Sequence, residues 1–317
     1  MRLDALGHDP DAFARAMLET GFVVLTDLGE GEQLHRDMMA DFATFVACSD
    51  EEKRRATSTR VYKNERHVPM WYCGYEGEQM REAFRVCSGL RDIGSWPSDD
   101  FRQRWAALSS FLQDVCDRCL SILLQQEIRV IAPRSTCPST LLRPARCCER
   151  HVTSCICWQA PADPDDDKSV AYAVHYPNDR GGQQEEGINI KQHYDPSLVV
   201  IEPIADAPVC MLFFRLSLSL GALGHCERLN ACVRVVANAG PACGLRAKPY
   251  PSRFRAWNAH APNQGLEIFD RRTETWLQVE AACEPGREMI VFGGQALERA
   301  TKGAVKASLH RVSASDR

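Results

Sequence analysis

Residues 193–195 read His-Tyr-Asp, and residues 308–312 read Ser-Leu-His-Arg-Val. A His-x-Asp pair with one later His is the ligand set of the two-His-one-carboxylate triad that holds non-haem Fe(II). Residues i and i+2 of a β-strand face the same side, so His193 and Asp195 can share one metal ion. His310, on a neighbouring strand, would supply the third ligand. Three protein ligands leave coordination positions open, which oxygen chemistry requires.

The composition is that of a globular chain with a small negative charge. Its 317 residues are 44% hydrophobic and 25% charged, with a net charge of −4, and they can bury a sizeable core in one domain or two. The chain lacks the strong positive net charge that would favour nucleic acid as a partner. Acidic residues interrupt the N-terminal segment where a secretory signal needs a continuous apolar core, so we expect a cytoplasmic protein. The longest apolar stretch, Val209–Gly224, is interrupted by Arg215 and is short for a membrane span.

Hydrophobic periodicity predicts a helical N-terminal region and a β-rich C-terminal region. Helices are expected over 11–20, ended by Gly21, and over 99–125, with a buried strand over 22–25 between them. Further strands are expected over 170–176, 188–201, 266–269, 276–279, 288–292 and 304–312. The segments 266–269 and 276–279 would form a hairpin. This pattern indicates an α+β fold with a mainly β core: a double-stranded β-helix (jelly roll) with flanking helices.

Two segments depart from this pattern. Residues 209–262 contain one acidic residue, Glu227, against seven basic ones, and they show no sustained period of two or 3.6. Residues 136–158 are similarly basic and rich in cysteine. We therefore expect an N-terminal helical or mixed region, 1–130, and a jelly-roll domain, 131–317, with atypical insertions near 136–158 and 209–262.

The 15 cysteines are not expected to form disulfides, because the cytosol keeps thiols reduced. Cys116 and Cys119 fall inside the predicted long helix, where we interpret them as small apolar groups and not as a redox or zinc pair. A second group, Cys147 to Cys157 with His151, has zinc-ligand residue types but no second Cys-x-x-Cys half. We therefore assign no metal to it.

A series of further motifs follows in order along the chain. They are Thr20-Gly21-Phe22-Val23-Val24, Arg81-Glu82-Ala83-Phe84, Val174-His175-Tyr176-Pro177, His193 to Val200, Gly265-Leu266-Glu267-Ile268 with Trp276 and Val279, Val291 to Thr301, and Ser308 to Val312. Together they resemble the 2-oxoglutarate/Fe(II)-dependent dioxygenases of the isopenicillin N synthase type. The resemblance is weak over residues 10–125 and strong over 170–208 and 263–313.

The resemblance implies a set of site residues. His193, Asp195 and His310 would be the catalytic, iron-binding residues, and Tyr176 would bond the distal carboxylate of 2-oxoglutarate. The family also has an arginine after the distal histidine, whose guanidinium fork matches that carboxylate. Arg317 is the last residue of the sequence. It is either this arginine, without the x-Ser that follows in the family, or the family's arginine would lie beyond a truncated C-terminus.

The function implied by the resemblance is that of an oxidoreductase. Fe(II), 2-oxoglutarate as cosubstrate and dioxygen would together oxidise a small-molecule substrate by hydroxylation or desaturation. Asp195 argues against halogenation, which needs a vacant position where the carboxylate binds. Two alternatives stay open: a non-haem iron oxidase that uses no 2-oxoglutarate, and a catalytically inactive jelly-roll protein with a binding or structural role. The sequence leaves the oligomeric state open, and it indicates neither a nucleic-acid nor a membrane partner.

Overall fold

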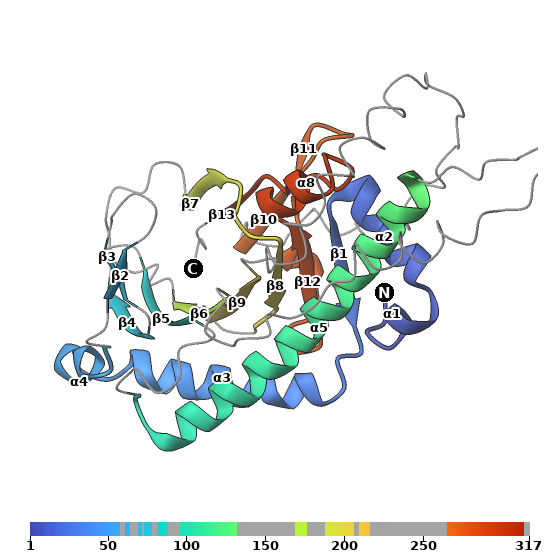
Figure 1. Ribbon diagram of the computed structural model, residues 1–317. Helices are drawn as coiled ribbons and strands as arrows, with labels where there is room; N and C mark the ends of the chain where they lie inside the picture. Colours follow the sequence, from blue (N-terminus) through green and yellow to red (C-terminus); the bar gives the residue numbers. More distant parts are fainter. Residues whose placement is uncertain are drawn as a thin grey trace, which may run out of the picture.

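The fold of the chain was obtained as a computed structural model (Figure 1). The structure describes residues 1–57, 61–63, 69–71, 73–77, 81–87, 96–131, 169–175, 188–205, 209–215 and 265–313. Tyr176, Arg317, the Cys147–Cys157 group and segment 136–158 lie outside these ranges, as do residues 216–262.

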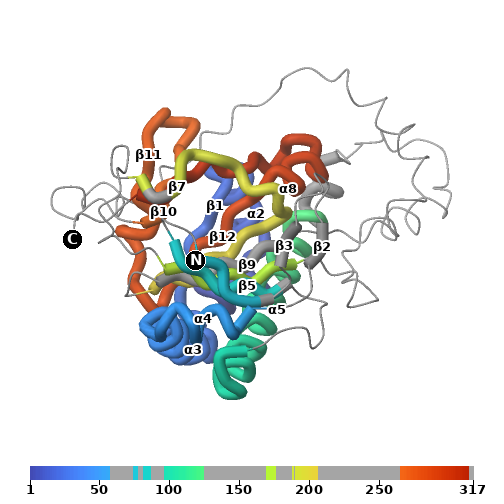
Figure 2. Tube along the Cα trace, turned by 90° about the vertical axis from the view of Figure 1, so that its left-hand side faces the viewer, coloured from blue at the N-terminus to red at the C-terminus, as the bar shows by residue number. Residues whose placement is uncertain are grey.

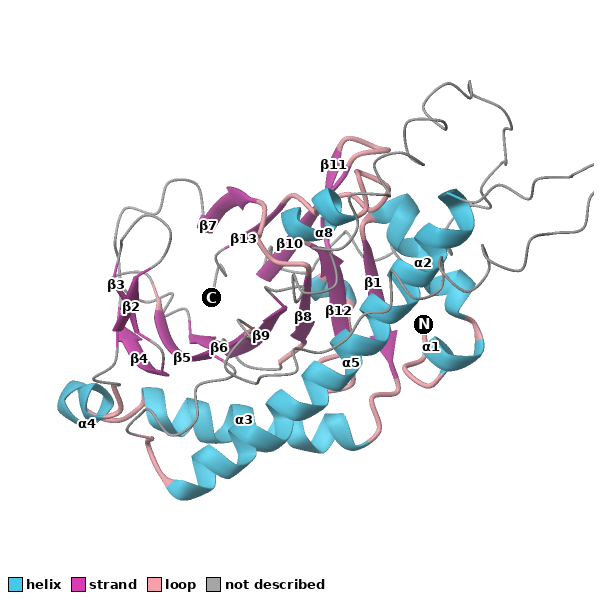
Figure 3. Cartoon of the chain, viewed as in Figure 1, coloured by secondary structure: helices cyan, strands magenta, loops and turns pink. Residues whose placement is uncertain are grey.

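Two antiparallel sheets form the centre of the molecule (Figure 3). The large sheet has the order β1 (Phe22–Thr26), β12 (Glu288–Gly293), β8 (Val199–Pro203), β9 (Val209–Arg215), β6 (Val170–His175), β5 (Glu82–Cys87), β4 (Cys73–Gly77). The small sheet has the order β11 (Thr275–Gln278), β10 (Gly265–Asp270), β13 (His310–Ser313), β7 (Ile188–His193). A separate pair is formed by β2 (Val61–Lys63) and β3 (Pro69–Trp71).

The described helices are α1 (Ala5–His8), α2 (Pro10–Thr20), α3 (Glu30–Val46), α4 (Asp50–Arg55), α5 (Asp99–Ile131) and α8 (Gln295–Ala300), with a short 3-10 turn, η5 (Glu280–Ala282). Helices α2, α3 and α5 pack against strands of the large sheet, whereas η5 contacts β10 of the small sheet. The two long helices α3 and α5 pack on each other and lie along the same side of the strands (Figures 1 and 3). No helix of the described residues is long and apolar enough to cross a membrane.

Two apolar cores result from the alternation of side chains along the strands. The larger core lies between the helices and the large sheet, where Phe84 of β5 contacts the rings of Phe45, Phe101 and Trp105. Truncating such a buried aromatic residue to alanine costs about 3–5 kcal/mol. The smaller core joins the two sheets and contains Phe22, Val200, Leu266, Ile268, Ile290 and Phe292. The two sheets therefore face each other with apolar side chains between them.

Local sequence explains where α2 ends and β1 begins. Asp9 caps the helix by accepting a hydrogen bond from the Ala12 N–H at 3.1 Å, and Pro10 occupies the first turn. Gly21 ends the helix with a left-handed φ of 81°, as predicted from the sequence. The chain then enters β1, which pairs with β12 from Phe22↔Phe292 to Thr26↔Glu288.

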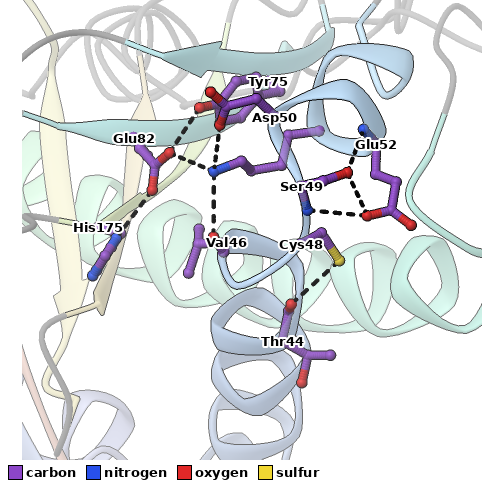
Figure 4. Close-up of polar contacts among 10 residues, drawn as sticks. Thr44, Val46, Cys48, Ser49, Asp50, Glu52, Tyr75, Glu82 and His175 are labelled. Atoms are coloured by element: carbon purple, nitrogen blue, oxygen red, sulfur yellow. Dashed lines mark hydrogen bonds and ion pairs between the residues drawn. The ribbon is translucent and has the colours of Figure 1, made fainter.

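A buried ion pair joins α4 to the large sheet. Lys53 of α4 donates to the Glu82 carboxylate of β5 at 2.7 Å, and both side chains are almost fully buried. Figure 4 shows Glu82 between Tyr75, whose hydroxyl donates to it at 2.8 Å, and His175, whose Nδ1 lies 3.4 Å away. A carboxylate can be buried at low cost only when it has such partners. The Ser49–Glu52 capping box starts α4 and directs Lys53 toward β5.

The observed elements agree with most of the predicted ones. The expected helices 11–20 and 99–125 correspond to α2 and α5, and the expected hairpin is the pair β10–β11. The α+β class is confirmed by antiparallel sheets with several helices. Strand β1 from the N-terminal region and β12 from the C-terminal region pair with each other, so one sheet spans the expected boundary at residue 130.

Three segments differ from the expectation. Residues 188–201 form two strands, β7 and β8, which belong to different sheets. Of residues 304–312, only His310 onward is a strand, because side chains and main-chain groups of neighbouring segments bind the amides of 305, 307 and 308. Residues 209–215 form β9 inside the large sheet, although the sequence grouped them with an atypical segment. The apolar run from Val209 to Phe214 suits a strand with a sheet neighbour on either side.

Candidate metal centre

The two histidines of the predicted triad lie side by side on neighbouring strands. His193 is the last residue of β7 and His310 is the first residue of β13, and the antiparallel register pairs them directly. Their ring centroids are 4.3 Å apart. Figure 1 shows β7 next to β13, and Figure 2 shows β7 on the same side of the molecule as β10 and β11 of this sheet. Residues 117 positions apart in the sequence are thus brought together by one strand pairing.

Asp195 completes the cluster from the turn that follows β7. Its Oδ1 lies 3.5 Å from His193 Nε2, and its Oδ2 lies 3.3 Å from His310 Nε2. Each of the three residues offers one potential ligand atom, and these atoms all lie within 4.8 Å of one another. Among the described residues, no other three His, Cys, Asp or Glu side chains converge in this way. Asp195 lies just beyond β7, although the His-x-Asp spacing predicted that it would share a strand with His193.

The other nitrogen of each ring is held by the main chain. His193 Nδ1 lies 2.9 Å from the Lys191 carbonyl, and His310 Nδ1 lies 3.0 Å from the Ser308 carbonyl. A carbonyl oxygen only accepts, so Nδ1 must carry the hydrogen in both rings. In a neutral ring this tautomer leaves the Nε2 lone pair on the side of Asp195, where a metal ion would accept it. In a protonated ring Nε2 instead donates a hydrogen bond to the Asp195 carboxylate.

Electrostatics at the cluster favour an ionised carboxylate. Burial alone would raise the pKa of Asp195, but hydrogen bonds and charge from His193 and His310 outweigh it and lower the pKa to about 2. The hydrogen bond to Asp195 raises the pKa of His193, against the opposing effect of burial. Asp195 and His310 are buried, while 39% of the His193 side chain is exposed. The cluster is therefore open to solvent on the His193 side.

Neighbouring elements fix the cluster in place. The Phe292 ring of β12 lies 4.9 Å from the His310 ring, which joins the small sheet to the large one at this point. The turn that carries Asp195 is bound by α8, because the Gln295 N–H donates to the Asp195 carbonyl at 2.8 Å and the Ala296 N–H donates to the Ser197 carbonyl at 3.0 Å. The three candidate ligands thus lie at the end of β7, in the following turn and at the start of β13. Contacts with α8 hold the turn, and Phe292 of β12 packs on His310.

A polar group on the large sheet was not found by sequence reasoning. Glu76 of β4 forms an ion pair with Arg85 of β5 and accepts a hydrogen bond from the Tyr172 hydroxyl of β6 at 3.0 Å. Arg81 lies 5.7 Å from the centre of the Tyr172 ring. Two-residue alternation puts Arg85 on the same face of β5 as Ala83, which clusters with residues of the ligand-bearing strands β7 and β13. In the sequence, the alternation of residues 81–85, Arg-Glu-Ala-Phe-Arg, could have indicated a strand that places Arg81, Ala83 and Arg85 on one face.

Other residues considered in the sequence have structural contacts. Arg311 binds Glu267 and lies 4.3 Å from the centre of the Trp276 ring, on the face of β13 opposite His310. Cys116 and Cys119 are fully buried in the larger core, where burial raises the pKa of the Cys119 thiol to about 12. A thiol with such a pKa is unreactive at neutral pH, which agrees with the apolar interpretation.

The donor atoms of His193, Asp195 and His310 match the Fe(II) that the sequence predicts. Two imidazoles with Nε2 directed to one side and one carboxylate form the facial set that suits non-haem Fe(II). The Nδ1–carbonyl contacts supply the outer hydrogen bonds that such ligands usually have. The residues present therefore fit this group of metals.

Solved structures with a similar fold include a protein of the 2OG-Fe(II) oxygenase family and proteins in complex with 2-oxoglutarate. A protein of Caulobacter crescentus assigned to the 2OG-Fe(II) oxygenase family is 15% identical, with a TM-score of 0.56 over 100% of this chain and 80% of that chain. A Neurospora crassa protein in complex with alpha-KG and thymine is 11% identical, with a TM-score of 0.56 over 100% and 80%. The dioxygenase for auxin oxidation 1 of Arabidopsis thaliana, in complex with 2-oxoglutarate, is 11% identical, with a TM-score of 0.55 over 100% and 86%.

No protein-family model matches the sequence, and no curated protein matches it. At identities of 11–15%, the likeness to the solved structures is a likeness of fold. The sequence resemblance to the isopenicillin N synthase type is confirmed at that level. The chain has the fold of the 2-oxoglutarate/Fe(II) oxygenases.

Proposed function

We propose that the protein is an Fe(II)- and 2-oxoglutarate-dependent oxygenase with a jelly-roll core. The convergence of His193, Asp195 and His310 within 4.8 Å, in a fold shared with such oxygenases, is the observation that carries the proposal. The two facing antiparallel sheets support the jelly roll. We keep the division into an N-terminal region, 1–130, and a jelly-roll region, 131–317, with atypical insertions near 136–158 and 209–262, of which residues 209–215 form β9.

His193, Asp195 and His310 would hold the metal ion. The Nε2 atoms of His193 and His310 would donate their lone pairs to it, while the main chain keeps hydrogen on Nδ1. Asp195 would add one negative charge, which partly neutralises a divalent ion. When bound, Fe(II) with 2-oxoglutarate and dioxygen supplies the oxidising chemistry, in which the cosubstrate is decarboxylated to succinate. The exposed side of His193 is where small molecules reach the centre.

The distal carboxylate of 2-oxoglutarate is assigned to Tyr176 and Arg317. Tyr176 directly follows β6, and a phenol hydroxyl can donate one hydrogen bond to a carboxylate. Arg317 follows β13 by four residues, and its guanidinium can donate two. Removing either donor, as Tyr176→Phe or Arg317→Gln, is expected to raise the Kd for 2-oxoglutarate roughly tenfold. Unchanged Kd values for both variants would refute the assignment.

The main substrate is a small molecule that is hydroxylated or desaturated. Fold neighbours of the chain include the Neurospora crassa protein crystallised with thymine and proteins described as dioxygenases for auxin oxidation, both of which concern small organic compounds. The polar group of Glu76, Arg85 and Tyr172 lies on the face of the large sheet directed to the ligand-bearing strands. We assign this face to substrate recognition.

Anaerobic titration of the whole chain with Fe(II) and 2-oxoglutarate tests the proposal. Formation of the weak visible charge-transfer band of the iron–2-oxoglutarate chelate is expected, and His193→Ala is expected to lose both the band and iron binding. Iron binding without the band would favour the oxidase that uses no 2-oxoglutarate. Absence of iron binding would favour the inactive binding or structural protein. Normal iron binding by His193→Ala would refute the ligand assignment.

A further inference from the structure

One short helix touches both halves of the candidate metal centre. At its start, α8 binds the turn that carries Asp195, through the Gln295 and Ala296 amides described above. From its middle, Glu298 reaches the segment that leads into β13. Its Oε2 accepts a hydrogen bond from the Ala307 N–H at 3.0 Å, and its Oε1 lies 3.2 Å from Lys306 Nζ.

The segment held by Glu298 directly precedes His310. Ala307 is followed by Ser308, whose carbonyl accepts the hydrogen bond from His310 Nδ1. The Ser308 N–H and hydroxyl are bound as well, to the carbonyls of Gly293 at 2.8 Å and Gly21 at 2.9 Å. The Ala307 amide is thus one of several anchors of this segment, and its release loosens the acceptor that orients the His310 ring.

A second contact converges on the same residue from the other side. Arg271 donates to the Ala307 carbonyl at 2.7 Å, and its guanidinium lies 6.0 Å from the centre of the Tyr194 ring. Tyr194 lies between the candidate ligands His193 and Asp195 in the sequence. Ala307 is thus bound through its N–H by a residue tied to the Asp195 turn, and through its carbonyl by a residue that contacts Tyr194.

We propose that Glu298 is a positioning residue for the metal centre, which sets the separation of Asp195 from His310 by binding the Ala307 amide from α8. This inference rests on the proposed function, because it assigns a role in metal binding. Hydrogen bonds to an ionised carboxylate are short and strong compared with neutral ones, so Glu298 suits this task. The Ala307 amide lowers the pKa of Glu298, which keeps the carboxylate ionised at neutral pH.

The main test is Co(II) binding by the whole chain, with Co(II) as a substitute for Fe(II) that is stable in air. Glu298→Ala is expected to weaken Co(II) binding about tenfold or more and to change the visible ligand-field spectrum, as is typical for loss of an outer partner of a ligand. Glu298→Gln is expected to restore both, because its amide oxygen can accept from Ala307. Arg299→Ala is the matched control, since Arg299 is the exposed neighbour on the same helix.

A metal-free measurement separates this inference from the metal assignment. Hydrogen exchange in the untreated wild-type chain and the variants reports on the segments 193–198 and 304–313. Glu298→Ala is expected to speed exchange in both, while Arg299→Ala leaves both unchanged. Equal exchange in Glu298→Ala and the wild type would overturn the positioning role, whether or not Co(II) binds. Absence of Co(II) binding by the wild type, with faster exchange in Glu298→Ala, would instead overturn the metal assignment.

Discussion

His193 and His310 are paired across β7 and β13, and the Nδ1 of each ring contacts the main-chain carbonyl two residues before it in the sequence. The two contacts are 2.9 and 3.0 Å long. The same hydrogen bond, from Nδ1 to the carbonyl two residues earlier, therefore sets the tautomer of both candidate ligands. Because each acceptor is a main-chain group, no substitution of a neighbouring side chain removes it directly.

Metal binding should weaken as the pH falls. The hydrogen bond to Asp195 raises the pKa of His193 above its ordinary value, so the imidazolium form, which cannot bind a metal, persists to higher pH. We expect Co(II) affinity to decrease from roughly pH 8 to pH 6, where histidine ordinarily titrates. Calorimetric titration in two buffers of different ionisation enthalpy would measure the affinity and the protons released. A pH-independent affinity without proton release would contradict this expectation.

Removal of Lys53 should strongly destabilise the fold. Lys53→Met leaves the Glu82 carboxylate buried without its cation, and breaking a buried pair in this way costs about 3–5 kcal/mol. The double variant Lys53→Met/Glu82→Gln should be more stable than the single one, because no buried charge remains. Urea unfolding monitored by circular dichroism gives both free energies of unfolding. A single variant as stable as the wild type would show that the pair contributes nothing.

The same carboxylate should make stability depend on acidic pH. Burial alone would raise the pKa of Glu82, but hydrogen bonds from Lys53, Tyr75 and His175 and the charge of Lys53 outweigh it and lower the pKa. Its contribution is thus present above the ordinary value near 4.5 and is lost as the pH falls through the lower, folded-state pKa. Acid unfolding of Glu82→Gln should show a smaller slope with pH than that of the wild type.

Substitution of Glu202 should stabilise the protein at alkaline pH. Burial, followed by the charge of Glu280, raises the pKa of Glu202 well above its ordinary value, and its Oε2 has no hydrogen-bond partner among the described residues. A raised carboxyl pKa gives stability that is complete below about 4.5 and lost as the pH rises. Glu202→Gln should therefore have a higher Tm than the wild type at pH 8 and a similar Tm at pH 4.

Glu284→Gln is the control for that comparison, because its carboxylate is 60% exposed. It should leave the difference in Tm between the two pH values unchanged. An equal effect of both substitutions would attribute the stabilisation to net charge and not to the buried group.

Substitution of Gly21 should destabilise the junction of α2 and β1. Its φ is 81°, and a Cβ there would lie 2.9 Å from Ser308 Oγ. The left-handed conformation alone costs an alanine roughly 1–2 kcal/mol. Gly7→Ala in α1 is the matched control, since a Cβ at Gly7 meets nothing within 4 Å. Thermal unfolding should show a lower Tm for Gly21→Ala only, and equal Tm values would contradict the role of Gly21.

Local sequence predicted the elements whose signals are local. Apolar periodicity located α2 and α5, and Gly21 ended α2 as predicted because glycine adopts the left-handed conformation without strain. The hairpin β10–β11 followed from two apolar runs around a polar turn. Helix α3 was not predicted, although Met38, Met39, Phe42 and Phe45 are buried at helical spacing. The polar residues between them weaken the pattern in the sequence.

Segments fixed by distant partners were predicted less well. Residues 304–309 alternate as a strand would, and Val305 and Ala307 are buried, yet the amides of these two residues bind the side chains of Thr301 and Glu298 instead of a neighbouring strand. Alternation reports which side chains are buried, not which groups bind the main chain. The split of 188–201 into β7 and β8 likewise depends on two sheets that the sequence does not separate.

The ligand types of the candidate metal centre can be predicted from the sequence, because His-x-Asp and a later His carry the chemistry in their side chains. That these side chains meet is a consequence of tertiary structure. The strand pairing of β7 and β13 places His193 beside His310, and α8 holds the Asp195 turn against the same strands. Such contacts join residues far apart in the sequence, and their geometry depends on sheet register and main-chain hydrogen bonds, which residue identity does not encode locally.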